Sequence, residues 1–180
     1  MSILKAIEFS ACAHLGHFRK GSKVPYITHP FEVAKILSDA VDPETNEILI
    51  SAGLLHDTVE DTNTSLDTIR EEFGEEVAAL VASDSENKQL SWEMRKQNTI
   101  DFLKNDATRD MQLLACADKL ANLRSIKEDY GKIGDAVWEI FIRGKEKQGW
   151  YYKGVVESLA TLGDLPMYFE LSHLTREIFD

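Results

Sequence analysis

One stretch of the chain carries an apolar run directly into a cluster of polar groups, and it reads Ile48-Leu49-Ile50-Ser51-Ala52-Gly53-Leu54-Leu55-His56-Asp57-Thr58-Val59-Glu60-Asp61-Thr62. The run is too short to span a bilayer, so it predicts a buried helix that delivers its polar end to a site. If that helix continues to Asp61, the i,i+4 pairs His56/Glu60 and Asp57/Asp61 aim at one cavity. The alternative is a solvated acidic helix end. An unpaired carboxylate beside an apolar run is costly, which favours a metal site.

Composition limits the class of protein. The chain has 180 residues, 43% of them hydrophobic and 28% charged, and we predict one soluble domain over residues 1–180. The first residues lack the apolar core of a signal peptide, and no stretch is long enough for a membrane helix. Cys12 and Cys116 lie in apolar, helix-like sequence, which predicts buried thiols in a reducing cytoplasm.

The charge balance bears on possible partners. A net charge of −11, from 31 acidic and 20 basic residues, argues against sequence-independent binding of nucleic acid, which needs a basic face. A phosphorylated small molecule stays compatible with this charge. Such a ligand needs a local basic patch and a metal to offset its own negative charge.

Helical periodicity recurs along the whole chain, and no segment alternates with period two over more than a few residues. We therefore predict an all-α fold, a bundle of about eight or nine helices. The expected helices cover residues 4–17, 30–40, 43–56, 66–73, 75–81, 91–103, 111–130, 134–162 and 166–179. Pro30 and Pro43 suit the first position of their helices, which places His29 near an N-cap.

Further metal ligands are expected among His and acidic residues on apolar backgrounds. Asp118 is the clearest case, because it lies mid-helix within the core-like segment 113–120, where a lone carboxylate is expensive unless a cation pairs with it. The alternative for Asp118 is a buried pair with Arg124 or Lys119. Together with His29 and the His56-Asp57 pair, Asp118 completes the order H…HD…D.

That order resembles the HD-domain metal-dependent phosphohydrolases, and longer matches make the resemblance more specific. They are similar to the hydrolase domain of RelA/SpoT-type alarmone enzymes, and more closely to the stand-alone small alarmone hydrolases. The matching segments are Ala13-His14-Leu15-Gly16-His17-Phe18-Arg19-Lys20, Pro25-Tyr26-Ile27-Thr28-His29-Pro30, Gly53-Leu54-Leu55-His56-Asp57-Thr58-Val59-Glu60-Asp61-Thr62 and Ala117-Asp118-Lys119-Leu120-Ala121-Asn122-Leu123-Arg124.

The resemblance implies an activity and a cofactor. It implies removal of the 3′-pyrophosphate from guanosine 3′,5′-bis(diphosphate) and its pentaphosphate relative, which gives GDP or GTP and pyrophosphate. It also implies one divalent ion, usually Mn²⁺, with the ligands His29, His56, Asp57 and Asp118. A bound divalent ion lowers the pKa of water by several units, and two imidazoles with two carboxylates leave coordination positions open.

The family places two further carboxylates, Glu60 and Asp61, at the reaction centre. We expect Glu60 to orient the attacking water and Asp61 to assist it, because a carboxylate that is not a ligand can accept protons. The resemblance also puts Arg19 and Lys20 at the nucleotide, while Asn122 would contact ribose or base. Arg19 and Lys20 could instead belong to a solvated loop, and Asn122 could be an amide that bridges helices.

Several alternatives stay open. The same metal site and carboxylates would serve another nucleotide, such as an adenine alarmone, a nucleoside monophosphate or a dinucleotide phosphate. A second alternative is a sensor, which would bind the alarmone without hydrolysing it. Ala121 and the loop 21–24 depart from the family pattern, so guanine and adenine both stay open as the base. The sequence also leaves the oligomeric state open. Trp150-Tyr151-Tyr152 suits core packing or an aromatic pocket wall. His14 and His17 are expected to pack or to contact the metal ligands without binding the ion, and His173 is expected to lie at the surface.

Overall fold

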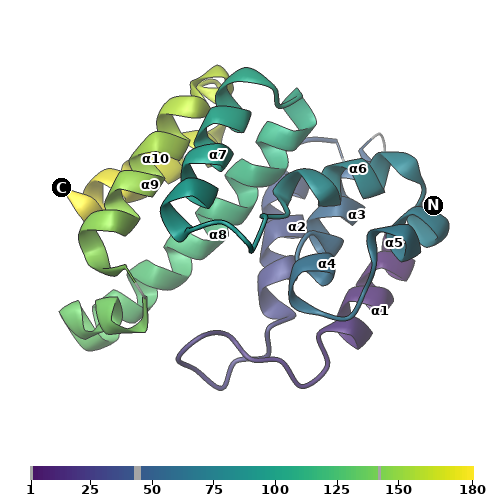
Figure 1. Cartoon of the computed structure of the whole chain (residues 1–180), viewed down its shortest axis with the longest axis horizontal. Coiled ribbons are helices and arrows are strands. Elements are labelled where there is room, and N and C mark those ends of the chain that lie inside the picture. Colours follow the sequence, from purple (N-terminus) through teal and green to yellow (C-terminus); the bar gives the residue numbers. More distant parts are fainter. Residues whose placement is uncertain (1, 43–45, 142) are drawn as a thin grey trace.

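Helices form the regular secondary structure of the protein, described here from a computed structural model that covers residues 2–42, 46–141 and 143–180. Within these residues the exception is one isolated β-bridge between Phe18 and Pro25. The predicted all-α fold is therefore confirmed (Figure 1). The helices are α1 Ile3–Ala13, α2 Thr28–Ala40, α3 Glu47–Leu55, α4 Thr58–Asp61, α5 Leu66–Phe73, α6 Glu75–Asp84, α7 Trp92–Asn105, α8 Arg109–Ile133, α9 Gly144–Ser158 and α10 Pro166–Phe179, with 3-10 helices at Gly134–Ile140 and Ala160–Leu162.

Helix α3 forms the centre of the N-terminal half. Every residue from Leu49 to Leu55 is buried, because apolar or small side chains occupy all faces of this segment and α1, α2, α6 and α8 pack around it. Gly53 allows the close approach of α2, since a Cβ atom there would lie 2.7 Å from Leu37 Cδ1. This contact brings the C-terminal end of α3 next to the start of α2.

Helix α8 connects the two halves of the molecule. It runs between α1–α6 on one side and α7, α9 and α10 on the other (Figure 1), and it packs against α2, α6 and α10. Thr108 caps its N-terminus, because its side chain accepts a hydrogen bond from the Met111 amide. The buried segment Leu113–Ala117 of its N-terminal half passes beside α3 and carries Asp118 toward the end of that helix.

Several predicted boundaries differ from the structure. The long helix expected over residues 134–162 is wrong: Gly134 and Gly144 adopt positive φ angles of 60° and 66°, which divide the segment into a 3-10 helix and α9. Helix α2 begins at Thr28, so His29 lies in its first turn. The expected start at Pro43 lies outside the described residues.

Helix α1 ends earlier than predicted, at Ala13, and packs against α3. It buries Ala6 and Ser10, whereas Leu4 and Leu15 are exposed. Cys12 is exposed as well, contrary to the prediction that both thiols are buried, while Cys116 is buried as expected. Ile3, Ile7 and Phe9 of this helix are partly buried against the core. None of the described helices combines the length and apolar character needed to cross a membrane.

Candidate active site

The His56-Asp57 pair lies in a turn between two helices. Helix α3 ends at Leu55 and the single turn α4 starts at Thr58, so the unbroken helix through Asp61 does not form. The Thr58 hydroxyl donates to the Leu55 carbonyl at 2.6 Å and occupies an acceptor that a continuing helix would use. The break leaves the side chains of both His56 and Asp57 directed at one point.

Four side chains from three parts of the chain meet at that point. His29 Nε2 lies 3.0 Å from Asp118 Oδ1 and 3.4 Å from Asp57 Oδ2. His56 Nε2 lies 3.0 Å from Asp57 Oδ2, 3.2 Å from His29 Nε2 and 3.7 Å from Asp118 Oδ1. His29, His56 and Asp118 are buried, and one carboxylate edge of Asp57 reaches a small cavity. All four predicted ligands are therefore together.

The spacing and charge of these atoms fit a divalent cation. Ligand atoms that share a small ion at about 2.1 Å in octahedral geometry lie roughly 3 Å apart. Without a cation, burial acts to lower the pKa of His56, but Asp57 and Asp118 outweigh it and raise this pKa well above its usual range. Because this environment strongly favours a buried positive charge, it is suited to a metal ion.

Glu60 and Asp61 lie beside the four-residue cluster. Glu60 is half-buried, its Oε2 accepts a 3.4 Å hydrogen bond from the Glu86 amide, and both Glu60 and Asp61 line the small cavity of about 200 Å³ that contains Asp57 and Asp118. Burial raises the pKa of Glu60, although Lys88 opposes this shift. A carboxyl group with a raised pKa is better suited to accept and return a proton near neutral pH.

Tyr26 connects the cluster to the carboxylate Asp61. Its hydroxyl donates to Asp57 Oδ2 at 2.6 Å and lies 3.2 Å from Asp61 Oδ2. Burial, followed by the charge of Asp57, raises the pKa of Tyr26. Tyr26 was not among the predicted site residues, and its position within Pro25-Tyr26-Ile27-Thr28-His29-Pro30 was the available signal.

Asp118 also has protein partners. Lys119 donates to its Oδ2, and Asn122 Nδ2 donates to its Oδ1 at 2.6 Å. The alternative partner Lys119 is therefore present beside the cluster, and its Nζ lies 3.8 Å from Asp84, a further carboxylate that was not among the predicted site residues. The alternative that Arg124 pairs with Asp118 is wrong, because the Arg124 side chain binds Glu170 on α10.

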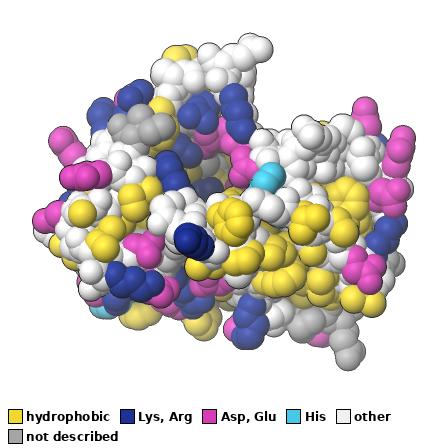
Figure 2. Space-filling model, turned by 90° about the horizontal axis from the view of Figure 1, so that it is seen from below, with side chains coloured by type: hydrophobic (Ala, Val, Ile, Leu, Met, Phe, Trp, Pro, Cys, Tyr) yellow, Lys and Arg dark blue, Asp and Glu magenta, His cyan; other side chains and the backbone are white. Residues whose placement is uncertain are grey.

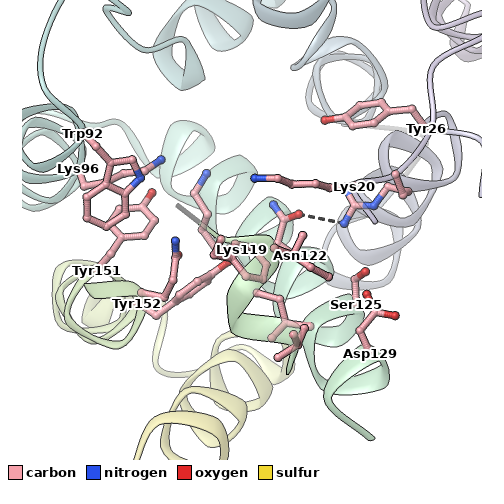
Figure 3. Close-up of a pocket in the computed structure, with 16 residues that line it drawn as sticks. Lys20, Tyr26, Trp92, Lys96, Lys119, Asn122, Ser125, Asp129, Tyr151 and Tyr152 are labelled. Atoms are coloured by element: carbon pink, nitrogen blue, oxygen red, sulfur yellow. Dashed lines mark hydrogen bonds between the residues drawn. The ribbon is translucent and has the colours of Figure 1, made fainter. Parts of the chain in front are cut away.

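A larger pocket adjoins the small cavity. It has a volume of about 360 Å³, and Arg19, Lys20 and Asn122 all line it. Arg19 donates to Asn122 Oδ1 at 3.1 Å and lies 5.7 Å from the centre of the Tyr26 ring (Figure 3). Figure 2, which shows the molecule from below, has Lys and Arg side chains gathered in and around a central hollow. The three predicted substrate-binding residues therefore share one pocket.

The aromatic triplet divides between two roles. Tyr151 and Tyr152 are buried and line the larger pocket, as Figure 3 shows, together with Trp92 from α7. Trp150 is 39% exposed and faces away from this pocket. Tyr151 and Tyr152 thus serve both as core residues and as a pocket wall.

The remaining histidines lie outside the four-residue cluster. His14 is buried, with its ring centre 4.8 Å from that of Tyr26. His17 is exposed, and so is His173, near Glu177. The positions of His14 and His173 agree with their expected roles, whereas His17 is exposed, contrary to the prediction, because it lies in the loop after α1.

Comparison with known proteins identifies similar chains. The model of the HD domain family matches residues 6–141. The guanosine-3′,5′-bis(diphosphate) 3′-pyrophosphohydrolases MESH1 of Xenopus tropicalis and Homo sapiens are 40% and 38% identical, and each alignment covers 69% of both chains. The crystal structure of lmo0812 from Listeria monocytogenes matches with a TM-score of 0.77 and 41% identity, over 84% of this chain and 98% of that one. A metazoan SpoT ortholog, titled as hydrolysing ppGpp, matches with a TM-score of 0.79 and 26% identity, over 97% and 94% of the two chains.

Proposed function

This chain belongs to the HD domain family, and from that premise we propose that it is a hydrolase that removes the 3′-pyrophosphate of guanosine 3′,5′-bis(diphosphate) or its pentaphosphate relative. The observation that carries the proposal is that two cavities adjoin. The small cavity at the His/Asp cluster and the larger pocket share Tyr26, Lys96, Lys119 and Asn122 in their walls. A nucleoside in the larger pocket can therefore present a phosphate to the cluster.

A divalent metal ion fits the cluster, and we propose Mn²⁺ as that ion. His29, His56, Asp57 and Asp118 would hold it, because their donor atoms already face one another at 3.0–3.7 Å. When bound, the ion offsets phosphate charge and lowers the pKa of water. The His56 ring is oriented for this role, since its Nδ1 lies 2.9 Å from the Gly53 carbonyl and its Nε2 faces the cluster.

Glu60 and Asp61 supply the proton chemistry. Water attacks the phosphorus that is bonded to the 3′-oxygen. The bond between this phosphorus and the 3′-oxygen breaks, and pyrophosphate leaves as one unit. Glu60 orients the water and accepts its proton, while the 3′-oxygen gains a proton and becomes a hydroxyl. Asp61 assists through Tyr26, whose hydroxyl lies within reach of both Asp61 and Asp57.

The larger pocket provides the substrate contacts. We assign Arg19 and Lys20 to the phosphates or the purine face, because a guanidinium can form bidentate phosphate contacts or stack on a ring. Asn122 would contact ribose or base, although its present partners are Arg19 and Asp118. We further propose that residues 1–180 act as one cytoplasmic domain on a free purine nucleotide, and not on nucleic acid or a membrane.

Product analysis tests this function. The purified protein with Mn²⁺ is incubated with guanosine and adenosine 3′,5′-bis(diphosphates), GTP, nucleoside monophosphates and dinucleotide phosphates, and the products are resolved by chromatography. We expect GDP and intact pyrophosphate from the guanosine 3′,5′-bis(diphosphate), and little reaction with GTP. Release of two orthophosphates, or faster cleavage of GTP or a monophosphate, would instead indicate a phosphohydrolase of different specificity. Binding without turnover would indicate a sensor.

A further inference from the structure

Three basic side chains lie in the small cavity and have no role in the steps above. Arg95 and Lys96 come from α7 and Lys119 comes from α8, and all three line the cavity that holds Asp57 and Asp118. Their side chains are largely buried, with exposed fractions of 22%, 19% and 13%. Three positive charges in a confined space need compensation by anions.

The protein compensates Lys119 through Asp118 and Asp84, and it compensates Arg95 and Lys96 through the single carboxylate of Glu86. The Glu86 carboxylate lies 2.8 Å from Arg95 Nη1 and 2.5 Å from Lys96 Nζ. Arg95 Nε is buried and has no hydrogen-bond partner among the described residues, so a donor is still unsatisfied. Burial, and next the charge of Lys119, lower the pKa of Lys96, against the effect of Glu86. Arg95 and Lys96 therefore share one carboxylate, Glu86, and a further anion beside them would satisfy the remaining donor.

The position of these cations relative to the cluster suggests which anion. Lys119 contacts Asp118 directly, and the Glu86 amide donates to Glu60. Lys96 and Lys119 also reach the larger pocket, where Figure 3 shows Lys96 on the side opposite Tyr26 and Lys119 between them. A phosphate at the cluster would therefore have the proposed base catalyst Glu60 and these cations around it.

We propose that Arg95, Lys96 and Lys119 bind the distal phosphate of the 3′-pyrophosphate, the one that is not bonded to ribose, and that Glu86 is their counter-ion when this phosphate is absent. The inference rests on the proposed function and extends it. It makes the site selective for a 3′-diphosphate over a 3′-monophosphate, because a single phosphate at the cluster leaves these cations without their ligand.

Binding of the inorganic products tests the subsite without turnover. The Mn²⁺-loaded protein is titrated calorimetrically with pyrophosphate and, separately, with orthophosphate, and metal analysis afterwards verifies that the ion is retained. We expect Lys96→Gln to weaken pyrophosphate binding by about tenfold or more, the value of one hydrogen bond to a charged group, and to change orthophosphate binding little. Glu86→Gln should tighten pyrophosphate binding, because it removes the competing carboxylate.

Matched variants control for charge and folding. Lys127→Gln removes an exposed lysine of α8 that pairs with Glu177, and it should behave as the wild type. Lys96→Arg should retain the preference for pyrophosphate, and circular dichroism verifies the fold of each variant. Arg95→Gln provides a second test if Lys96→Gln does not fold. Equal affinity of the wild type for both anions would overturn the subsite, and weaker pyrophosphate binding in Glu86→Gln would overturn the counter-ion role.

A kinetic comparison separates this inference from the proposed function. The ratio of kcat/KM for guanosine 3′,5′-bis(diphosphate) to that for guanosine 5′-diphosphate 3′-monophosphate should fall about tenfold in Lys96→Gln. An equal loss on both nucleotides would show that Lys96 contacts another part of the substrate. If the wild type hydrolyses neither nucleotide, the proposed function fails, while the titrations still decide whether the subsite exists.

Discussion

The chemistry of single residues at the site depends on which atom faces the cluster. His56 directs Nε2 inward because Nδ1 is 2.9 Å from the Gly53 carbonyl, so a proton on Nδ1 can donate there and Nε2 stays free for a cation. Tyr26 holds the carboxylate of Asp57 in the same manner from the cavity side. The Glu60 carboxylate instead accepts a hydrogen bond from the Glu86 amide, outside the four proposed ligands, which separates its role from theirs.

Glu60→Gln tests that separation of roles. The variant should retain its metal ion and its nucleotide affinity but lose about 10²–10⁴-fold in kcat, the usual contribution of a general base. A base must be ionised, and burial raises the pKa of Glu60, so wild-type activity should fall with decreasing pH before an ordinary carboxyl group would protonate. Metal analysis and a pH–rate profile provide the measurements. Loss of the metal in Glu60→Gln would show that Glu60 is a ligand.

Site residues could be predicted from the sequence where a polar or charged residue interrupts or follows an apolar segment. Asp118 in a core-like helix and His56-Asp57 after an apolar run are such cases, and the structure brings them together with His29. Tyr26 and Asp84 could not be named, because their positions depend on contacts across the fold. Tyr26 and Asp57, for example, are 31 residues apart in the chain.

The helices could be predicted from periodicity, whereas their ends depended on local chemistry. Ser65 and Ser91 cap α5 and α7 as their residue types predict, each by accepting a hydrogen bond from a backbone amide three residues later. The break after α3 and the positive φ angles at Gly134 and Gly144 follow from a hydroxyl contact and from glycine conformations. Hydrophobic periodicity contains neither kind of information.

Gly53→Ala tests the close approach of α2 and α3. In an open helix position this change adds stability of about 0.5–1 kcal/mol, because alanine is the better helix former. At Gly53 the new Cβ atom would lie 2.7 Å from Leu37 Cδ1 in a packed interior, and overpacking costs about 1–3 kcal/mol. We therefore expect a net loss in the free energy of unfolding, measured by urea denaturation.

Gly131→Ala is the matched control for this change. Gly131 is also helical, on α8, but a Cβ atom there would meet no atom within 4 Å. It should leave stability unchanged or increase it. If both variants are equally stable, the glycine at position 53 is not required for helix packing.

At the scale of the whole molecule, the His/Asp cluster connects elements that are distant in sequence. His29 lies in the first turn of α2, His56 and Asp57 follow α3, and Asp118 lies in α8, the helix between the two halves. The chain carries a net charge of −11, yet its larger pocket gathers basic side chains from the loop after α1 and from α7 and α8. A local basic pocket in an acidic protein favours a compact polyanion over an extended one.

Metal removal tests whether the cluster stabilises the whole fold. An ion that binds the native state alone, at about 100 times its dissociation constant, adds about 2.7 kcal/mol, and for a chain of this size each kcal/mol shifts Tm by about 2–4 °C. Addition of Mn²⁺ to chelator-treated protein should therefore raise Tm by about 5–10 °C in a calorimetric scan. Asp118→Ala should abolish the increase, whereas Asp39→Ala, which removes an exposed carboxylate that pairs with Lys35, should preserve it. An unchanged Tm in the wild type would contradict a metal site at this cluster, because an ion held by three separate elements must favour the state in which they meet.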